Sequence, residues 1–353
     1  MKDTYLPHKK IEIFCGTGGV GKTTLAASRA LHLASIGRKV LLITIDPSKR
    51  LKEVLKLNLS DAGDISTVPI KRFTDYTHSN NIFDALLMSP RKTIQRMGKF
   101  DINLKNLKNP IIKILTRPNG GMNEIMAIIE VQFHLDTKKY DTIILDTPPG
   151  KHFIDFLESA NKINLFFDKT YIEIFKYLGK TINNTSITKA PTKILSFIVS
   201  SGVKKLLSYL EKVTGKEFVN TFVDAIYTLY QNRDSFLQAI KFQKDLRDEN
   251  KTNWILVTSS EQKKMIEAND LHSSASSIIH NNSFLAINKC HSEHLYNWHP
   301  SDALLLSLKN SFIEKEKELN LFASKNFTDI LKFPEVLSED PENHVSCLAA
   351  KWS

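Results

Sequence analysis

The chain has 353 residues and a formal charge of +10 at neutral pH, from 48 Lys and Arg against 38 Asp and Glu. Hydrophobic residues make up 42% and charged residues 24%, the balance of a soluble globular protein, which excludes a disordered chain. The longest apolar stretch, around 194–203, falls short of the roughly 20 residues that a membrane-spanning helix needs. Because the lysines are spread along the chain and no nucleic-acid-binding motif is present, we expect no nucleic-acid partner.

The N-terminal residues and the cysteines indicate the cellular compartment. The first residues lead directly into the β-type segment 11–14, without the long apolar region or cleavage site of a secretion signal. The cysteines, Cys15, Cys290 and Cys347, lie far apart in the sequence and form no CxxC pair, as expected in a reduced compartment. We therefore expect a cytoplasmic protein.

Apolar runs in the sequence predict a parallel sheet. Two short β-type runs, 11–15 and 40–45, flank a segment with helical spacing that ends at Gly37. A third run, 142–145, ends in Asp146, and two more follow at 254–257 and 284–287. Continuous apolar runs of this kind suit parallel strands that helices cover on both faces. The sequence thus predicts a three-layer, doubly wound, mostly parallel α/β sheet.

Two long inserts, about 55–138 and 151–250, separate these strands and have mostly helical periodicity. The first is expected to open with a strand pair near 65–86. We predict that both form a mainly helical subdomain within one domain that spans 1–353. Their apolar faces either pack on each other and on the sheet, or line a groove for an apolar client. The tail, 333–353, is expected to be a loop with a short terminal helix.

The segment GTGGVGKTT, residues 16–24, matches the phosphate-binding pattern GxxxxGK[ST] between a predicted strand and a predicted helix. Glycines let the backbone wrap the phosphates closely, and N–H groups at a helix N-terminus favour anions. Lys22 would neutralise charge on the β and γ phosphates, and Thr23 would offer its hydroxyl to magnesium. We therefore predict a site for a nucleoside triphosphate and Mg²⁺, built from Gly18, Gly19, Val20, Gly21, Lys22, Thr23 and Thr24.

Two aspartates follow predicted strands. Asp146 closes the run TIILD and is placed to support magnesium, which in such sites needs a carboxylate at the end of a neighbouring strand. Asp46, in ITIDPSKR, is placed to orient or deprotonate the attacking water, because it too falls at the carboxyl edge of the sheet. An aspartate at a strand end can also be a helix cap. We predict a functional role for both.

Three segments, GGVGKTT, TIDPSKRL and LDTPPGKHFIDFL, resemble the deviant P-loop, switch I and switch II of the arsenite-pump ATPase (ArsA) family, in the same order and at similar separations. That family also contains the ATPases that deliver tail-anchored proteins to membranes. The likeness covers most of the chain and is greatest to the bacterial subgroup with DPxxRL and DTPP. It implies an ATP-hydrolysing homodimer whose interface opens and closes with nucleotide state, with Lys22 and Asp46 as catalytic residues and Thr23 and Asp146 at the metal.

Asn288, in FLAINKC, resembles the asparagine that binds adenine after a late strand in this family, although an asparagine at this point could equally be a turn residue. The family's deviant loop carries a signature lysine that reaches the partner's nucleotide, and this chain has Thr17 there. Either hydrolysis is slow and the chain is a nucleotide-gated binding switch, or another cation takes over, with Lys49, Arg50 and Lys151 as candidates.

The sequence does not identify the client of the protein. We expect an unknown protein or small molecule, and a membrane protein is a possible partner. Arsenite capture needs converging thiolates, and the three cysteines are remote from one another. The absence of CxxC argues against a metal-bridged dimer. The motif CHSEH, with Cys290, His291 and His294, is a weak metal pattern, and we expect a solvated loop. A relative of the partition ATPases that act on DNA or membranes is a third hypothesis, which the helical inserts and DTPP disfavour.

Overall fold

The computed structural model describes residues 6–45, 50–57, 62–97, 110, 123–166, 208–209, 211–231, 234, 236–237, 240–280, 282–327 and 329–352. The chain divides into two compact units. The first, which we call the sheet unit, comprises Met1–Met88, Glu130–Leu157 and Phe242–Ser353, and the second comprises Ser89–Ile129 and Glu158–Lys241.

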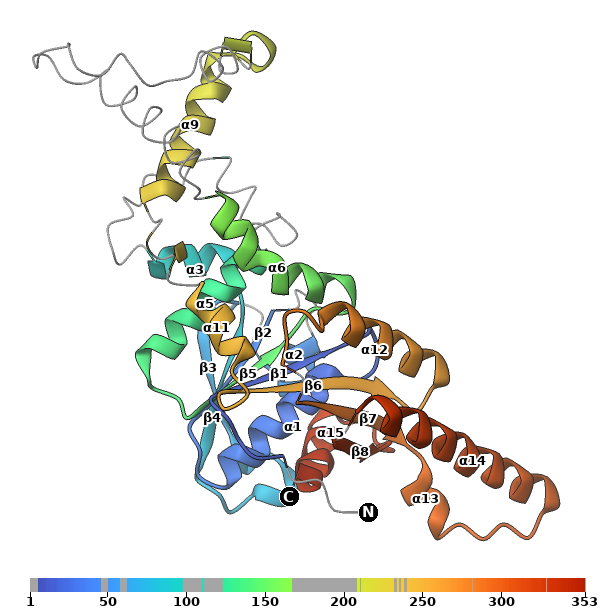
Figure 1. Ribbon diagram of the computed structural model, residues 1–353. Helices are drawn as coiled ribbons and strands as arrows, with labels where there is room; N and C mark the ends of the chain where they lie inside the picture. The colour runs from blue at the N-terminus through green and yellow to red at the C-terminus, as the bar shows by residue number, and fades with distance from the viewer. Residues whose placement is uncertain are drawn as a thin grey trace, which may run out of the picture. The chain divides into compact units, whose positions relative to one another are not determined.

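The sheet unit is built on eight strands in the order β3-β4-β2-β5-β1-β6-β7-β8 (Figure 1). Their bounds are β1 Ile11–Gly16, β2 Val40–Thr44, β3 Ile65–Pro69, β4 Ile82–Leu87, β5 Thr142–Asp146, β6 Thr252–Ser259, β7 Ser283–Cys290 and β8 Asp329–Pro334. Each neighbouring pair is parallel except β3 and β4, which are antiparallel. The predicted mostly parallel sheet is therefore confirmed, and so is the strand pair near 65–86.

Strand β8 was not expected from the sequence. The tail was predicted to be a loop with a short terminal helix from 333 onwards, but Phe333 and Pro334 close β8. In this strand only Leu331 and Phe333 are fully buried, because β8 lies at the edge of the sheet. Such an alternating strand lacks the continuous apolar run by which the central strands were found. The short terminal helix is present as α15, Pro341–Ala349, followed by a 3₁₀ turn, Ala350–Trp352.

Helices cover both faces of this sheet. On one face lie α1, Lys22–Ser35, and α15, with Phe14 of β1 packing edge-on against Trp352. On the other lies α12, Gln262–Ala275, whose Leu271 and Ala275 line a small cavity together with Cys15, the residue after Phe14. Because successive side chains of a strand point to opposite faces, the two helix layers enclose the sheet. The remaining helices of the sheet unit are α2 Arg50–Leu55, α11 Lys241–Arg247, α13 Ser292–Tyr296 and α14 Ala303–Asn326.

The described parts of the second unit are helical. They include α3, Pro90–Met97, and α9, Lys216–Gln231. Helices α5, Asn123–Thr137, and α6, Lys151–Phe166, each begin or end in the sheet unit. In the described part of the chain, no helix has the length and apolar character needed to cross a membrane.

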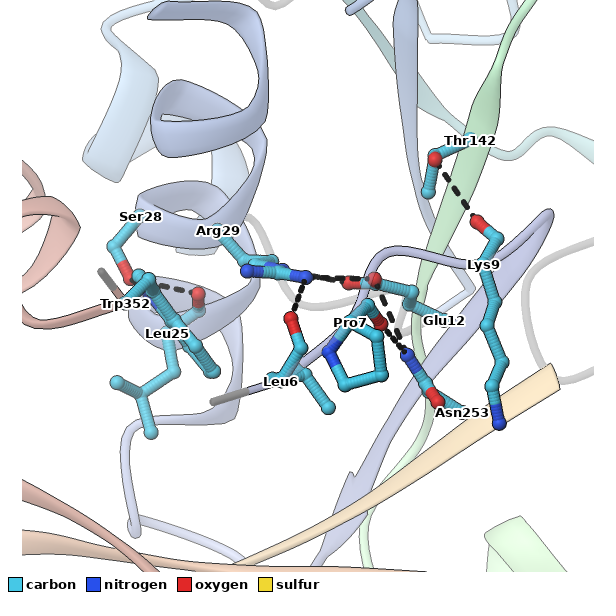
Figure 2. A network of polar contacts seen from close by, with 10 residues as sticks. All are labelled: Leu6, Pro7, Lys9, Glu12, Leu25, Ser28, Arg29, Thr142, Asn253 and Trp352. Carbon is cyan, nitrogen blue, oxygen red and sulfur yellow. Dashed lines mark hydrogen bonds and ion pairs between the residues drawn. The ribbon is translucent and has the colours of Figure 1, made fainter. Parts of the chain in front are cut away.

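A buried ion pair fixes α1 to the sheet (Figure 2). Arg29 of α1 donates from Nε to Oε2 of Glu12 at 2.9 Å and from Nη2 to Oε1 at 3.0 Å, and the two side chains are 1% and 0% exposed. Arg29 also donates to the Leu6 carbonyl, and Asn253 of β6 donates to the Pro7 carbonyl. The helix that follows the glycine-rich loop is thereby held to β1 by charge-assisted hydrogen bonds.

The last described residue of the chain also packs against α1. Trp352 donates from Nε1 to Ser28 Oγ at 2.8 Å, and Ser28 in turn donates to the Leu25 carbonyl. The Arg29 guanidinium lies 5.3 Å from the centre of the Trp352 ring. One hydrogen bond and one cation–π contact therefore join Trp352 to the same turn of α1 (Figure 2).

Candidate nucleotide-binding site

The loop between β1 and α1 has a backbone that requires glycine at several positions. Gly16 ends β1 with φ 148°, and a Cβ there would lie 2.2 Å from the Val257 carbonyl oxygen of the neighbouring strand β6. Gly19 and Gly21 have φ 81° and 90°, in the left-handed region that other residues adopt only with strain. The glycines of the predicted phosphate-binding loop are thus explained by its local geometry.

The outer side of this loop is open. Gly18 and Gly19 are exposed, and a Cβ built on either would meet nothing within 4 Å. Directly after the loop, α1 begins at Lys22 with no side-chain cap and no acidic residue in its first turn. The N-terminal N–H groups of a helix carry partial positive charge, and anions bind there. The loop and the helix end together form an open cradle, bounded by Gly18, Gly19, Val20, Gly21 and Thr24, whose exposed glycines and free helix N-terminus would suit a phosphate group.

Lys22 bends back over the loop. Its ammonium group donates to the Thr17 carbonyl at 2.8 Å, and the side chain is 7% exposed. The backbone of the loop therefore holds the positive charge of Lys22, the residue predicted to contact phosphate, beside the cradle. Thr17, the residue at the position of the family's signature lysine, is itself buried and offers its carbonyl to Lys22.

Thr23 and Asp146 meet at the end of β5. The Thr23 hydroxyl donates to Asp146 Oδ2 at 2.7 Å, and both residues are buried. Thr44, the last residue of β2, donates to the same oxygen at 2.9 Å. The sequence predicted that Thr23 and Asp146 serve one metal site, and the structure brings them into contact. Thr44 was missed, although its position at the end of a neighbouring parallel strand was a usable signal.

The segment after Asp146 is tied to the glycine-rich loop. Thr147 donates from its hydroxyl to the Phe14 carbonyl at 2.9 Å, and the Gly150 N–H donates to the Gly16 carbonyl at 3.2 Å. Gly150 has φ 55° and precedes α6. The segment that resembles switch II is therefore attached at two points to the strand and the glycine from which the phosphate-binding loop starts.

Asn288 lies within β7 and not in a turn. Its Nδ2 donates to the Val20 carbonyl at 2.9 Å, and a Cβ on Gly21 would lie 2.3 Å from the same nitrogen. The side chain is 5% exposed. In this structure Asn288 supports the phosphate-binding loop from below, a contact that its resemblance to the adenine-binding asparagine did not indicate.

Two of the other predicted residues lie outside the described residues, namely Asp46 and Lys49. Arg50 begins α2 and Lys151 begins α6, and both side chains are exposed. The roles assigned to these four residues stay predictions.

The cysteines and the CHSEH motif lie on separate elements of the sheet unit. Burial raises the pKa of the Cys15 thiol and that of the Cys290 thiol to about 12 each, so both stay protonated. His291 packs edge-on against Phe312, and His294 contacts the Glu335 carbonyl. Within the described ranges, no group of three or more His, Cys, Asp or Glu side chains is placed to hold a metal ion.

A doubly wound sheet, a glycine-rich loop between β1 and α1, and the contact of the Thr23 hydroxyl with the Asp146 carboxylate together define the fold of the P-loop nucleoside triphosphatases. A profile of the anion-transporting ATPases (ArsA) matches residues 9–302. The chain belongs to this family, as the three motifs of the sequence predict.

Named relatives agree with this assignment. The "ATPase GET3" of Mycosarcoma maydis is 31% identical over 170 residues, 47% of this chain and 46% of that protein. An "ATPase ASNA1 homolog" of Plasmodium chabaudi chabaudi is 33% identical over 187 residues, 53% of this chain and 43% of that protein. The "ATPase GET3" of Zygosaccharomyces rouxii is 25% identical over 256 residues, 65% of this chain and 68% of that protein. The chain thus spans less than half the length of the first two relatives.

Proposed function

We propose that this protein binds ATP together with Mg²⁺ and hydrolyses the γ-phosphoanhydride bond, and that it works in the cytoplasm. The observation that carries the proposal is the contact of Thr23 with Asp146, in the first turn of the helix that follows a cradle whose lysine is already in place. A phosphate chain laid in the cradle would meet the N-terminus of α1, the open side of Gly18 and Gly19, and the Lys22 ammonium. These groups all stabilise negative charge, as phosphoryl transfer requires.

Residues Thr23 and Asp146 would hold the magnesium ion. A hydroxyl and a carboxylate are the hard oxygen donors that Mg²⁺ prefers, and the hydrogen bond between them fixes the hydroxyl's orientation. When bound, a magnesium ion held by these two residues would supply positive charge that offsets the charge of the phosphates. Thr44 keeps Asp146 in position by donating to the same oxygen as Thr23.

Changing Asp146 to asparagine tests the metal assignment. We expect ATP affinity measured in EDTA to stay near that of the wild type, while the gain in affinity on adding Mg²⁺ is lost and turnover falls by at least about 100-fold. Isothermal titration with and without Mg²⁺ measures both affinities. The matched control is Asp141→Asn, which changes the exposed aspartate just before the same strand. A variant that keeps the full Mg²⁺ effect contradicts the assignment.

For Asp46 we propose that the carboxylate orients or deprotonates the attacking water, since the family resemblance implies that this residue acts on the hydrolytic water. The Asp46→Asn variant is then expected to bind ATP with unchanged affinity and to lose hydrolysis by roughly 10²- to 10⁴-fold, since a general base contributes on that order. Phosphate release in a single turnover, combined with a binding titration, measures the two effects separately. Simultaneous loss of binding and hydrolysis contradicts this division of roles.

We further propose that the protein acts as a homodimer and couples its nucleotide state to the binding and release of a client. The helical character of the second unit supports a client-binding role for that unit. The client is an unknown protein or small molecule, and a membrane protein is one candidate. A pull-down with the Asp46→Asn variant, which is designed to bind ATP without hydrolysing it, is the direct way to identify it.

A second candidate function is a nucleotide-gated binding switch with little or no turnover. The observation that favours it is the buried Thr17, a neutral residue where the family resemblance places a lysine. A cation supplied in trans accelerates phosphoryl transfer by roughly 10³- to 10⁵-fold in other P-loop enzymes, and threonine supplies none. Single-turnover phosphate release separates the two functions, because a switch holds ATP without releasing phosphate.

A further inference from the structure

The first turns of α12 lie beside the glycine-rich loop. Strands β1 and β6 are parallel, with Gly16 paired to Val257, so the loop and the segment that leads to α12 leave the sheet at the same edge. In that segment the Ser260 N–H donates to the Asn288 carbonyl at 3.1 Å, and the Asn288 side chain donates to the Val20 carbonyl of the loop. The start of α12 is therefore anchored next to the cradle.

Lys264 and Glu267 form an ion pair in this part of α12. The Lys264 ammonium lies 2.8 Å from Glu267 Oε2, and the two residues are three positions apart, so they share one face of the helix. Their side chains are 27% and 34% exposed, which leaves most of each in contact with protein. The pair therefore holds the Lys264 ammonium in a defined position on the helix.

Glu267 brings this ammonium close to the glycine-rich loop. The pKa of Glu267 lies below its ordinary value, chiefly because Lys264 donates a hydrogen bond to the carboxylate, and the nearby Thr17 hydroxyl adds to the effect. One carboxylate group therefore separates the Lys264 ammonium from Thr17. Thr17 directly precedes Gly18, which is exposed and borders the open side of the cradle. The ammonium thus lies near that open side.

Thr17 also marks the end of the cradle at which a terminal phosphate would lie. In P-loop proteins the lysine of the motif reaches the β and γ phosphates, and here the Lys22 ammonium donates to the Thr17 carbonyl at 2.8 Å. Thr17 is 7% exposed, and its Oγ1 makes no hydrogen bond of ordinary geometry among the residues that the structure describes. Buried polar atoms in proteins nearly always have a partner, so this hydroxyl indicates a place for a ligand oxygen or a water molecule.

We propose that Lys264 is a second phosphate-binding cation of this site, whose ammonium contacts the terminal phosphate of a nucleoside triphosphate held in the cradle. The inference rests on the proposed function and deepens it, because it assigns a source of positive charge beside the neutral Thr17. Without a ligand, Glu267 holds the ammonium near the loop. A terminal phosphate carries more negative charge than one carboxylate, so it attracts the ammonium more strongly, and the same contact offsets charge during phosphoryl transfer.

The test compares the affinities for ADP and for the slowly hydrolysed analogue ATPγS, which differ in the terminal phosphate group. Isothermal titration of Lys264→Ala with Mg²⁺ is expected to show affinity for ATPγS lowered by at least about tenfold and affinity for ADP within about twofold of the wild type, because a hydrogen bond to a charged group is lost only with the longer nucleotide. The matched control is Lys263→Ala, which removes the exposed neighbouring lysine and should change neither affinity. Thermal unfolding verifies the fold of each variant. A loss in Lys264→Ala that is equal for the two nucleotides, or no loss for ATPγS, overturns the inference.

Two further variants separate a phosphate contact from indirect effects of the ion pair. In Glu267→Gln the carboxylate no longer competes for the ammonium, so we expect ATPγS affinity at or above that of the wild type. The double variant Lys264→Ala with Glu267→Gln is expected to bind ATPγS as weakly as Lys264→Ala.

Recovered affinity in the double variant would mean that the unpaired carboxylate repels the nucleotide, and it overturns the inference. Weak binding by Glu267→Gln alone would mean that the ion pair acts only by positioning α12, and it overturns the inference as well. A wild type that binds neither nucleotide overturns the proposed function and this inference with it. A wild type that binds both, with Lys264→Ala unchanged, overturns only this inference.

Discussion

The Lys22→Ala variant is expected to lose ATP affinity by roughly 10²- to 10³-fold while keeping its fold. Truncating one partner of a buried, hydrogen-bonded charge contact costs about 2–5 kcal/mol, and each 1.4 kcal/mol corresponds to about tenfold in affinity. Lys22 is buried beside the phosphate cradle and held by the Thr17 carbonyl, so its ammonium is in place before a ligand arrives. A preorganised charge of this kind gives more binding energy than a mobile surface lysine.

Isothermal titration with MgATP and with MgADP measures this loss, and thermal unfolding verifies the fold. The matched control is Lys39→Ala, which removes the exposed lysine just before β2, at the opposite edge of the sheet. The Lys22→Arg variant restores the charge on a larger planar group and is expected to recover only part of the affinity. If Lys22→Ala and the wild type bind ATP with equal affinity, Lys22 does not contact the phosphates and the proposed nucleotide site is wrong.

Breaking the Glu12–Arg29 pair is expected to have the largest effect on stability. Replacing either partner alone, as Glu12→Leu or Arg29→Leu, leaves one charge buried without its counter-ion and should lower the free energy of unfolding by about 3–5 kcal/mol. The double variant removes both charges. We expect it to be more stable than either single variant, because the buried charge that dominates the cost is gone.

Denaturant unfolding followed by the fluorescence of the buried Trp254 and Trp352 measures these differences in the sheet unit. The exposed pair of Lys351 and Glu293 supplies the control, since Glu293→Gln should change the free energy of unfolding little. If the single variants are as stable as the wild type, the buried charge of Arg29 does not need Glu12 as its counter-ion, and the prediction is wrong. A double variant less stable than both singles would show that an unpaired buried charge is not the main cost of the single substitutions.

The central strands and the phosphate-binding loop could be predicted because their sequence signals are local. The runs 11–15, 40–45 and 142–145 are mostly apolar, as strands covered on both faces usually are, and each corresponds to a strand. The loop carries glycines where the backbone has positive φ or approaches another strand closely. At these positions the residue types alone indicate the local backbone geometry.

Features that depend on distant parts of the chain could not be predicted. Asn288 contacts Val20 across 268 positions of sequence, and the contact follows from the pairing of β6 with both β1 and β7, which no local pattern encodes. The buried pair of Glu12 and Arg29 has the same origin, since a charged residue in a strand suggests a solvent-facing position until its partner is known. The edge strand β8 lacked a continuous apolar run.

The close approach of Gly21 to Asn288 has a consequence for how this protein can evolve. A methyl group at position 21 would overlap the Asn288 amide at 2.3 Å, and the φ of 90° at Gly21 would strain any larger residue even beside a smaller side chain at 288. The two positions therefore differ in their freedom to vary: glycine is required at 21, whereas a smaller residue at 288 leaves the space beside the loop open. Descendants should keep glycine at 21, and a side chain at 288 that reaches further toward the loop than asparagine should be selected against before any effect on ligand chemistry arises.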